Sequence, residues 1–370
     1  MSFLETKYIC DEKEFYDLKE DWNRLLQQSQ SDTPFLTFEW AYAWWQSMKA
    51  ANRSLFILVF FKESKMVGIA PLAILHSKKY GFLSLKKVEF MGYEIANGEY
   101  LDFITAPGME SEVSEGVVNF LIKNFKLWDV LELQPWFESA ISLFYFKKLC
   151  DQHGLKTFLF LRSICPIVSL PKNWEEFRQS LSKSLRKKSE YNFRRLYKEN
   201  QTTLSCWDSK QEIREKLPEF FEMHQKKWNA EGETGTFADP RKCEFYKELS
   251  DQFFDNNWLH VCRLEINQQP VSYLYGIRYN NCFYDLQSAY DLNWQARSVG
   301  TVLLYHSLQN CVTNGIDFYD FLRGEEKYKY QWGAQPRRNL RLLIFKTGLL
   351  HFIFKVTRRK KIKEQVSIPT

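Results

Sequence analysis

The sequence predicts an α/β protein of two domains, with mixed, mostly antiparallel sheets flanked by helices. Three observations support this prediction. The chain has 370 residues, enough for two domains with separate cores. Each half combines a meander of apolar segments and short turns with amphipathic helical segments. Aromatic residues make up 17% of the chain and are spread along its whole length, which is typical of large packed domains rather than disordered segments.

The first half is predicted to begin with two helices and to continue as a meander. The helical patterns cover 14–29 and 38–48, and Thr37 is the expected N-cap of the second helix. Two strand-like runs, 55–62 and 67–76, flank a short turn and predict a hairpin. Further strands are expected at 85–92, 99–106, 128–136 and 156–163, and further helices at 111–125 and 141–154.

The second half is predicted to open with one long helix over 173–200. A meander over 258–291 has turn residues at 267–269 and 280–281. The other expected elements are strands at 202–207 and 316–324 and helices at 212–230, 239–256 and 301–315. We therefore expect an N-terminal domain at 1–165, a C-terminal domain at 166–345 and a basic tail at 346–370.

The segment 282–315 is the most informative for function. A strand leads through the loop LNWQARSVG into a helix, and such a turn can hold a phosphate on the free N–H groups of the helix N-terminus. The segment has neither the Walker lysine pattern nor a full GxGxxG. We therefore expect neither ATP at a P-loop nor NAD at a Rossmann turn, and the remaining candidate is the pyrophosphate of coenzyme A.

The net charge of +6 is unevenly distributed. Residues 337–370 contain ten Lys or Arg and a single acid, Glu364. A second basic cluster covers 182–198, with only Glu190 opposing it. This cluster is either a solvated helix face or a contact for a phosphorylated acceptor, a nucleotide-sugar or RNA.

The predictions of cellular location and membrane contact depend mainly on the sequence at the two ends of the chain. The N-terminus has no signal-peptide pattern and no window is apolar enough to span a bilayer, so we expect a cytoplasmic protein. The tail is expected to form a last strand over 340–346, a packed helix and a frayed end. The alternative is a peripheral contact at the inner membrane face, with 358–363 on anionic lipid.

The eight cysteines predict no metal and no disulfide framework. They are far apart, form no CxxC and do not pair with the six histidines at metal-ligand spacing. Most lie in apolar surroundings, where cysteine behaves as a small hydrophobic residue. We expect buried, reduced thiols.

Three motifs resemble one family. FLTFEWAYAWW at 35–45, FFEMHQKKWNAEGETGTF at 220–237 and above all DFLRGEEKYKYQWG at 320–333 are similar to the bacterial CelD/BcsL-like acetyltransferases. That family belongs to the GNAT superfamily and is related to the Fem-type peptidyltransferases, which carry two GNAT-like domains in one chain. The resemblance implies tandem GNAT-like domains, with catalysis in the C-terminal one. It also implies transfer of an acyl group from acyl-CoA, most simply acetyl-CoA, to an amine of a cell-envelope or exopolysaccharide precursor, without a metal.

The cofactor loop of the family maps onto a short run of this sequence. The residues are Arg297, Ser298, Val299, Gly300 and Thr301. Gly300 would let the backbone approach a phosphate, and N–H groups near Thr301 would donate to it. The sequence departs from the family pattern at one point, because the second glycine is replaced by Val302. The alternative is that Gly300 merely begins a helix.

The resemblance also implies catalytic and substrate-binding residues. The catalytic residues are His224, Asp320, Tyr328 and Lys329. The substrate-binding residues are Trp228, Phe237, Asp285, Arg323 and Glu325. His224 is expected to be the base, Tyr328 the acid for the leaving thiolate, and Lys329 an anchor for a carboxylate or phosphate. In the competing interpretation these residues are structural: His224 is a hydrogen-bonded helix residue, the tyrosines pack, and Asp320 pairs with Arg323.

Two other functions fit the same residues. One is a Fem-type transferase that uses aminoacyl-tRNA, with the 182–198 cluster as the RNA contact. The other is a non-catalytic, membrane-associated partner of polysaccharide synthesis that keeps the fold without the cofactor. Trp40 and Trp44 share one helix face, which predicts core packing rather than a platform for sugar stacking.

Overall fold

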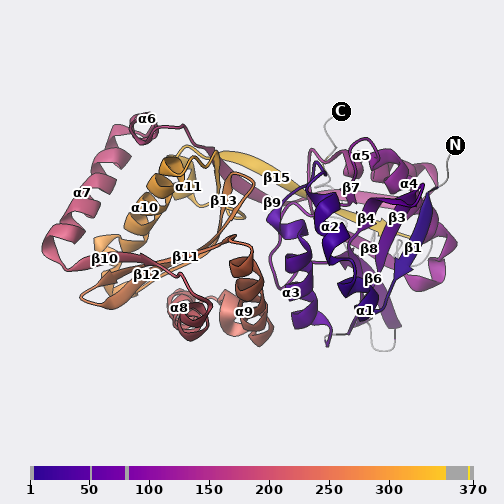
Figure 1. The fold of residues 1–370 in the computed structure, drawn as a ribbon, viewed down its shortest axis with the longest axis horizontal. Coiled ribbons are helices and arrows are strands. Elements are labelled where there is room, and N and C mark those ends of the chain that lie inside the picture. The colour runs from indigo at the N-terminus through magenta and orange to yellow at the C-terminus, as the bar shows by residue number, and fades with distance from the viewer. Residues whose placement is uncertain (1–3, 51, 80–82, 347–365, 367–370) are drawn as a thin grey trace. The chain divides into compact units, whose positions relative to one another are not determined.

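The computed structural model describes residues 4–50, 52–79, 83–346 and 366 (Figure 1). Two compact units are present: the first consists of residues up to Ser163 and from Arg338 onward, and the second of Ile164–Arg337. The chain passes between them within β9 (Lys156–Ser169) and again within β15 (Gln335–Phe345). The expected domain boundary at 345 differs from this division, because residues from Asn339 onward pair with β8 (Val130–Phe137) of the first unit.

The first unit contains the tryptophan-rich helix. Thr37 Oγ1 accepts a hydrogen bond from Trp40 N at 3.2 Å and caps α3 (Phe38–Met48), as predicted. Trp40 and Trp44 are fully buried, which confirms the core interpretation. The other helices of this unit are α1 (Glu12–Tyr16), α2 (Lys19–Leu26), η1 (Pro34–Leu36), α4 (Glu110–Lys123), η2 (Phe125–Leu127) and α5 (Ile141–Gln152).

The strands of the first unit form two groups. An antiparallel sheet has the order β1-β3-β4-β7, and a second group has the order β15-β8-β6-β5-β2. The predicted hairpin is confirmed as β3 and β4, with Glu63 and Ser64 at positive φ in the turn. Its second strand ends before Pro71, whereas the sequence suggested one strand over 67–76. The bounds are β1 (Glu5–Ile9), β2 (Arg53–Leu55), β3 (Ile57–Lys62), β4 (Lys65–Ala70), β5 (Leu72–Lys79), β6 (Leu83–Phe90) and β7 (Ile104–Thr105).

The second unit is one sheet with helices on both faces. The strand order is β10-β11-β12-β13-β14-β9, and all neighbours are antiparallel except β13 and β14. Helices α7 and α10 lie on one face and α8 and α9 on the other (Figure 1). The bounds are β10 (Thr202–Cys206), α8 (Lys210–Ala230), η3 (Thr236–Ala238), α9 (Pro240–Asp255), β11 (Leu259–Ile266), β12 (Gln269–Tyr279), β13 (Cys282–Tyr290), η4 (Leu292–Arg297), α10 (Val299–Thr313), β14 (Phe318–Asp320) and α11 (Lys327–Gln331).

The long helix predicted over 173–200 is two helices. These are α6 (Trp174–Ser180) and α7 (Lys183–Glu199). Ser182 Oγ accepts from Leu185 N at 3.2 Å, so Ser182 is the N-cap of a new helix rather than an interior residue. The two meander turns are confirmed, with Asn267, Gln268, Asn280 and Asn281 all at positive φ.

Candidate functional site

A cavity of about 420 Å³ lies in the second unit at the N-terminal end of α10. Its volume is in the range of small-molecule sites. Both faces of the sheet contribute, because α7, α8, α10, α11 and the strands β12 and β13 all supply lining residues. The polar lining residues are Lys188, Ser189, Lys227, Ser272, Asp285, Ser288, Thr301 and Gln331, with Tyr273, Tyr290 and Tyr328.

The cavity follows from a separation of two parallel strands. β13 and β14 pair only between 282–284 and 318–320. Beyond that point β13 continues to Tyr290. The segment that follows β14 turns away from β13 at Leu322, whose φ is 53°. Among the described residues, no strand pairs with this side of β13 from Asp285 onward. Its backbone N–H and C=O groups there are therefore available to a ligand.

A β-bulge decides which side chain of β13 reaches the cavity. The register shifts so that Tyr275 faces Gln287 while Gly276 faces Asp285, which leaves Leu286 as the extra residue. Residues two apart on a strand normally share a face, and a bulge breaks that rule. Asp285 therefore points toward Tyr319 and α10, and Gln287 toward His224 on α8.

Asp285 has the environment of a general base. Tyr319 OH donates to Asp285 Oδ2 at 3.0 Å, and Ser307 Oγ on α10 donates to Tyr319 OH at 3.3 Å. Desolvation raises the pKa of Asp285 to about 6, although the Tyr319 hydrogen bond and the charge of Lys329 act in the opposite direction. Burial also keeps the pKa of Tyr319 well above its usual value, so this phenol remains a donor. A carboxylate with a pKa near 6 is ionised at neutral pH and can still accept a proton.

Tyr328 and Lys329 are neighbours on α11 with different roles. Tyr328 lines the cavity with its side chain 44% exposed, and partial desolvation of its hydroxyl raises its pKa, so it is protonated at neutral pH. Lys329 is only 4% exposed. Its Nζ donates to the carbonyls of residues 321–324 at 3.2–3.3 Å and pairs with Glu326 at 2.9 Å. The ammonium thus holds the loop after β14 and does not line the cavity.

This arrangement predicts a large stability loss for Lys329→Met. The change leaves buried carbonyl oxygens without their donor, so the free energy of unfolding should fall by about 2–4 kcal/mol. Urea unfolding followed by circular dichroism measures it. Lys327→Met, at an exposed position of the same helix, is the control and should change stability by no more than about 0.5 kcal/mol. Equal stabilities of the two variants would contradict this role.

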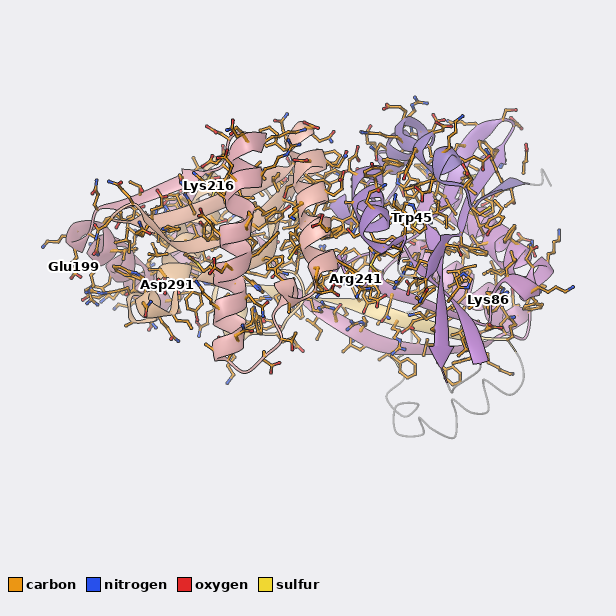
Figure 2. All side chains as sticks on the ribbon, turned by 90° about the horizontal axis from the view of Figure 1, so that it is seen from below. Trp45, Lys86, Glu199, Lys216, Arg241 and Asp291 are labelled. Carbon is orange, nitrogen blue, oxygen red and sulfur yellow. A yellow bond between two sulfur atoms is a disulfide. The ribbon has the colours of Figure 1, made fainter. Side chains whose placement is uncertain are left out.

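The five residues of the predicted cofactor loop separate into two groups. Gly300 and Thr301 line the cavity. Arg297 pairs with Glu199, which is labelled in Figure 2 at the end of α7, and Val299 is buried in the core. Ser298 has φ 55° and begins α10 without a side-chain cap. Because the first N–H groups of a helix have no intrahelical partner, those of Val299, Gly300 and Thr301 are available beside the cavity.

The sequence did not single out three other lining residues. Ser189 is 1% exposed, and its Oγ has no hydrogen-bond partner among the described residues. Lys188 precedes it on α7, within the basic cluster that the sequence did reveal. Lys227 Nζ lies 5.1 Å from the ring centroids of both Trp228 and Tyr290. Two cations and an unpartnered buried hydroxyl near a helix N-terminus favour an anionic ligand.

His224, Trp228 and Phe237 do not line the cavity. His224 is buried on α8, where Trp228 Nε1 donates to its Nε2 at 3.0 Å and the Gln287 side chain lies 3.1 Å from the same nitrogen. Burial lowers the pKa of His224 to about 4. The Phe237 ring packs against it at 4.9 Å. The residue predicted as the base therefore lies in an aromatic cluster, with its Nε2 occupied as an acceptor.

Asp320, Arg323 and Glu325 also lie outside the cavity lining. Asp320 is buried and its Oδ1 accepts from Leu322 N at 2.8 Å. Phe318, two residues earlier on β14, is exposed, and Leu322 lies beyond the end of β14 at positive φ.

The cysteine expectation is wrong for one pair. Cys206 and Cys262 form a disulfide across 56 residues of sequence. They are direct cross-strand partners of β10 and β11, a proximity that sequence spacing cannot show. Cys150, Cys165, Cys282 and Cys311 are buried and form no disulfide, as expected.

Two observations concern the membrane. No helix in the described part of the chain is long and apolar enough to cross a bilayer. The predicted strand over 340–346 is confirmed within β15, whereas the basic residues 358–363 lie outside the described residues.

Comparisons with known proteins agree with this fold. A family model described as an acetyltransferase (GNAT) domain matches residues 183–330, which carry the cavity. No curated protein is detectably similar to the chain. The structure of FemX has a TM-score of 0.65 at 10% identity, covering 95% of this chain and 99% of FemX.

Two further solved structures share the fold. L-PGS from Bacillus licheniformis has a TM-score of 0.54 at 9% identity, over 92% of this chain and 96% of its own. The C-terminal domain of a putative lysylphosphatidylglycerol synthetase from Agrobacterium fabrum has 0.52 at 10% identity, over 95% and 97%. At such identities the likeness concerns the fold alone. The predicted fold class, mixed α/β with GNAT-like domains, is confirmed.

Proposed function

We propose that this chain is an acyl-CoA-dependent N-acyltransferase of the CelD/BcsL-like type. The observation that carries the proposal is Asp285 at the point where β13 leaves β14, facing a cavity at the N-terminus of α10. The GNAT match over the same residues supports it. The acceptor is an amine of a cell-envelope or exopolysaccharide precursor, and acetyl-CoA is the simplest donor.

The residues present fit a coenzyme A ester. The N–H groups at Gly300 and Thr301, with Lys188 and Lys227, would hold its phosphates, and Ser189 Oγ offers one more hydrogen bond. The open side of β13 would pair with the amide groups of the pantetheine arm. The bound ester supplies an activated carbonyl with a thiolate leaving group.

The chain's own groups complete the transfer. Asp285 accepts a proton from the acceptor ammonium, and the free amine then forms the new C–N bond as the C–S bond breaks. Tyr328 donates its proton to the departing thiolate and takes up the second proton that the acylated nitrogen loses, so the phenol is restored. The Ser307–Tyr319 hydrogen bonds keep the Asp285 carboxylate oriented throughout. No covalent enzyme intermediate is required.

A second candidate is a Fem-type transferase that uses aminoacyl-tRNA. The FemX fold over nearly the whole chain favours it. The exposed basic residues of α7 favour it as well, since they continue from the cavity at Lys188 along the helix. They are Lys183, Lys187, Lys188, Arg194 and Lys198.

Thermal shift and calorimetry with three probes test the proposal. We expect acetyl-CoA to stabilise the protein and desulfo-CoA to bind competitively with it. Stabilisation by charged tRNA alone, lost at high salt, would replace the proposal with the second candidate. If none of these three probes binds while vesicles of anionic lipid capture the protein, the protein is a non-catalytic partner at the inner membrane face.

A further inference from the structure

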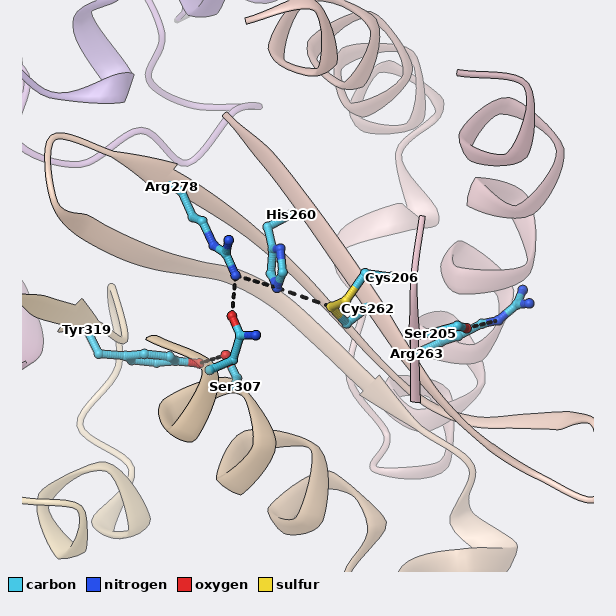
Figure 3. Close-up of a disulfide and its surroundings, with 9 residues drawn as sticks. Ser205, Cys206, His260, Cys262, Arg263, Arg278, Ser307 and Tyr319 are labelled. Atoms are coloured by element: carbon cyan, nitrogen blue, oxygen red, sulfur yellow. Dashed lines mark hydrogen bonds between the residues drawn. A yellow bond between two sulfur atoms is a disulfide. The ribbon is translucent and has the colours of Figure 1, made fainter. Parts of the chain in front are cut away.

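Three metal-ligating side chains converge on the α10 face of the sheet in the second unit. Cys206 ends β10, and Cys262 lies directly opposite it on β11. His260 precedes Cys262 by two residues and therefore shares its face. The two sulfurs and an imidazole nitrogen all lie within 4.8 Å of one another, and His260 Nε2 is 3.1 Å from Cys262 Sγ (Figure 3).

These separations suit a tetrahedral ion. Zn–S bonds of about 2.3 Å and a Zn–N bond of about 2.0 Å place two sulfurs about 3.8 Å apart, and a sulfur and a nitrogen about 3.6 Å apart. Cross-strand cysteines reach that sulfur separation by side-chain rotation once the S–S bond is open. Two thiolates and an imidazole are ligands that zinc prefers.

The surroundings hold the histidine in place. The Phe283 ring meets the His260 ring edge to face at 5.5 Å. Arg278 Nη2 lies 3.4 Å from His260 Nε2 (Figure 3) and also donates to Asn310 on α10. An ion on Nε2 requires this guanidinium to withdraw, and Asn310 already provides a partner for it there.

We propose that Cys206, His260 and Cys262 form a zinc site whenever the disulfide is reduced. A dithiol reductant gives two electrons and two protons to the bridge, which yields two thiols and the oxidised, cyclic reductant. Zn²⁺ then binds as the two sulfurs release their protons and become thiolates. Cys206 is exposed, so the fourth coordination position is open to water. A small-molecule disulfide takes two electrons from the two thiolates and, with two protons, is reduced to two thiols, which forms the Cys206–Cys262 bridge again and releases Zn²⁺.

The position of this site gives it a structural consequence. β10 joins α7 to α8, and both helices line the cavity, through Lys188 and Lys227. β10 is the edge strand of the sheet and is held by its pairing with β11. Either the disulfide or the zinc ion cross-links these two strands. The reduced, metal-free chain has neither, so the connection between the two helices should be least stable in that state.

The experiment uses the full chain, reduced with a dithiol that is then removed without air. Zn²⁺ is titrated against a chromophoric chelator, and Co²⁺ is added separately to record thiolate-to-cobalt charge transfer and the bands of a tetrahedral ion. We expect one ion per reduced chain, none per oxidised chain, and a higher Tm of the reduced chain with Zn²⁺. Cys206→Ser, Cys262→Ser and His260→Gln should each lose the ion. Cys10→Ser, which removes an exposed free thiol, should keep it.

Two results would overturn the proposal. One is a reduced wild-type chain that binds no ion while its circular dichroism shows an intact fold. The other is a Co²⁺ spectrum of Cys206→Ser that equals that of the reduced wild-type chain, because the ion would then not need the Cys206 thiolate. Because the readouts are metal content and absorption, they do not depend on whether the cavity binds coenzyme A.

Discussion

Replacing Asp285 with Asn should lower kcat about 100- to 10,000-fold with acetyl-CoA binding retained. A positioned general base contributes a factor of this size, and the amide cannot accept the ammonium proton. The variant keeps the cavity shape, since Asn Oδ1 can still accept from Tyr319. Single-turnover acyl transfer to an amine, measured beside calorimetric binding of acetyl-CoA, separates the loss of chemistry from a loss of binding.

The same carboxylate should set the acid side of the pH profile. The pKa of Asp285 is raised to about 6, so the base becomes protonated as the pH falls through that value. In wild type, kcat/KM should drop about tenfold per pH unit below 6, and this limb should be absent from Asp285→Asn.

The free energy of unfolding of Asp285→Asn shows whether its loss of activity could come from a loss of stability. The pKa of Asp285 is higher in the folded state than its value of about 3.9 in the unfolded chain. Such a carboxyl group destabilises the folded state as the pH rises above that unfolded value, and the full loss of stability is reached above the folded pKa. Removing the charge should therefore leave the protein at least as stable at pH 8. His224→Gln is the matched variant at the residue that the motif suggested as base. If His224→Gln loses the acid limb and Asp285→Asn keeps it, the assignment to Asp285 is wrong.

The sequence predicted the elements of the site better than the side chains within it. The strand, loop and helix over 282–315 appear as β13, η4 and α10, because apolar periodicity and turn residues report local structure directly. The prediction of one long helix was wrong at Ser182, which is the N-cap of α7. The apolar pattern alone does not distinguish such a capping serine from a serine inside a helix.

Two kinds of feature could not be predicted from the sequence pattern: strand register and tertiary contacts. Asp285 was expected to bind substrate and lines the cavity, but the direction of its side chain depends on the bulge at Leu286, and bulges depend on how two strands are aligned. The Cys206–Cys262 bridge also depends on strand register. Lys329 was expected to anchor a carboxylate or phosphate, but its Nζ donates to four backbone carbonyls after the chain turns at Leu322. Neither strand register nor the meeting of distant backbone groups produces a periodic pattern in the sequence. Pattern analysis could therefore not find these features.

Gly300→Glu should weaken acetyl-CoA binding about 100-fold. A carboxylate placed in the first turn of α10 would repel the phosphates that this turn is proposed to hold, at a cost of a few kcal/mol in a partly exposed site. The fold should survive for two reasons. Acidic residues in a first helical turn are favourable, and an added Cβ at Gly300 meets only the Tyr290 ring, at 3.4 Å.

Two variants at the same position separate charge from volume. Gly300→Gln has nearly the same size as the Glu variant without its charge, and Gly300→Ala adds a single methyl group. If phosphate repulsion is the cause, the Glu variant should bind far more weakly than the Gln variant, and the difference should shrink as salt rises. Equal losses in Glu and Gln would mean that the side chain merely fills the cavity. Unchanged binding in all three variants would show that α10 does not hold the phosphates. The missing second glycine already departs from the family pattern. The aminoacyl-tRNA function would then be the better explanation of this cavity.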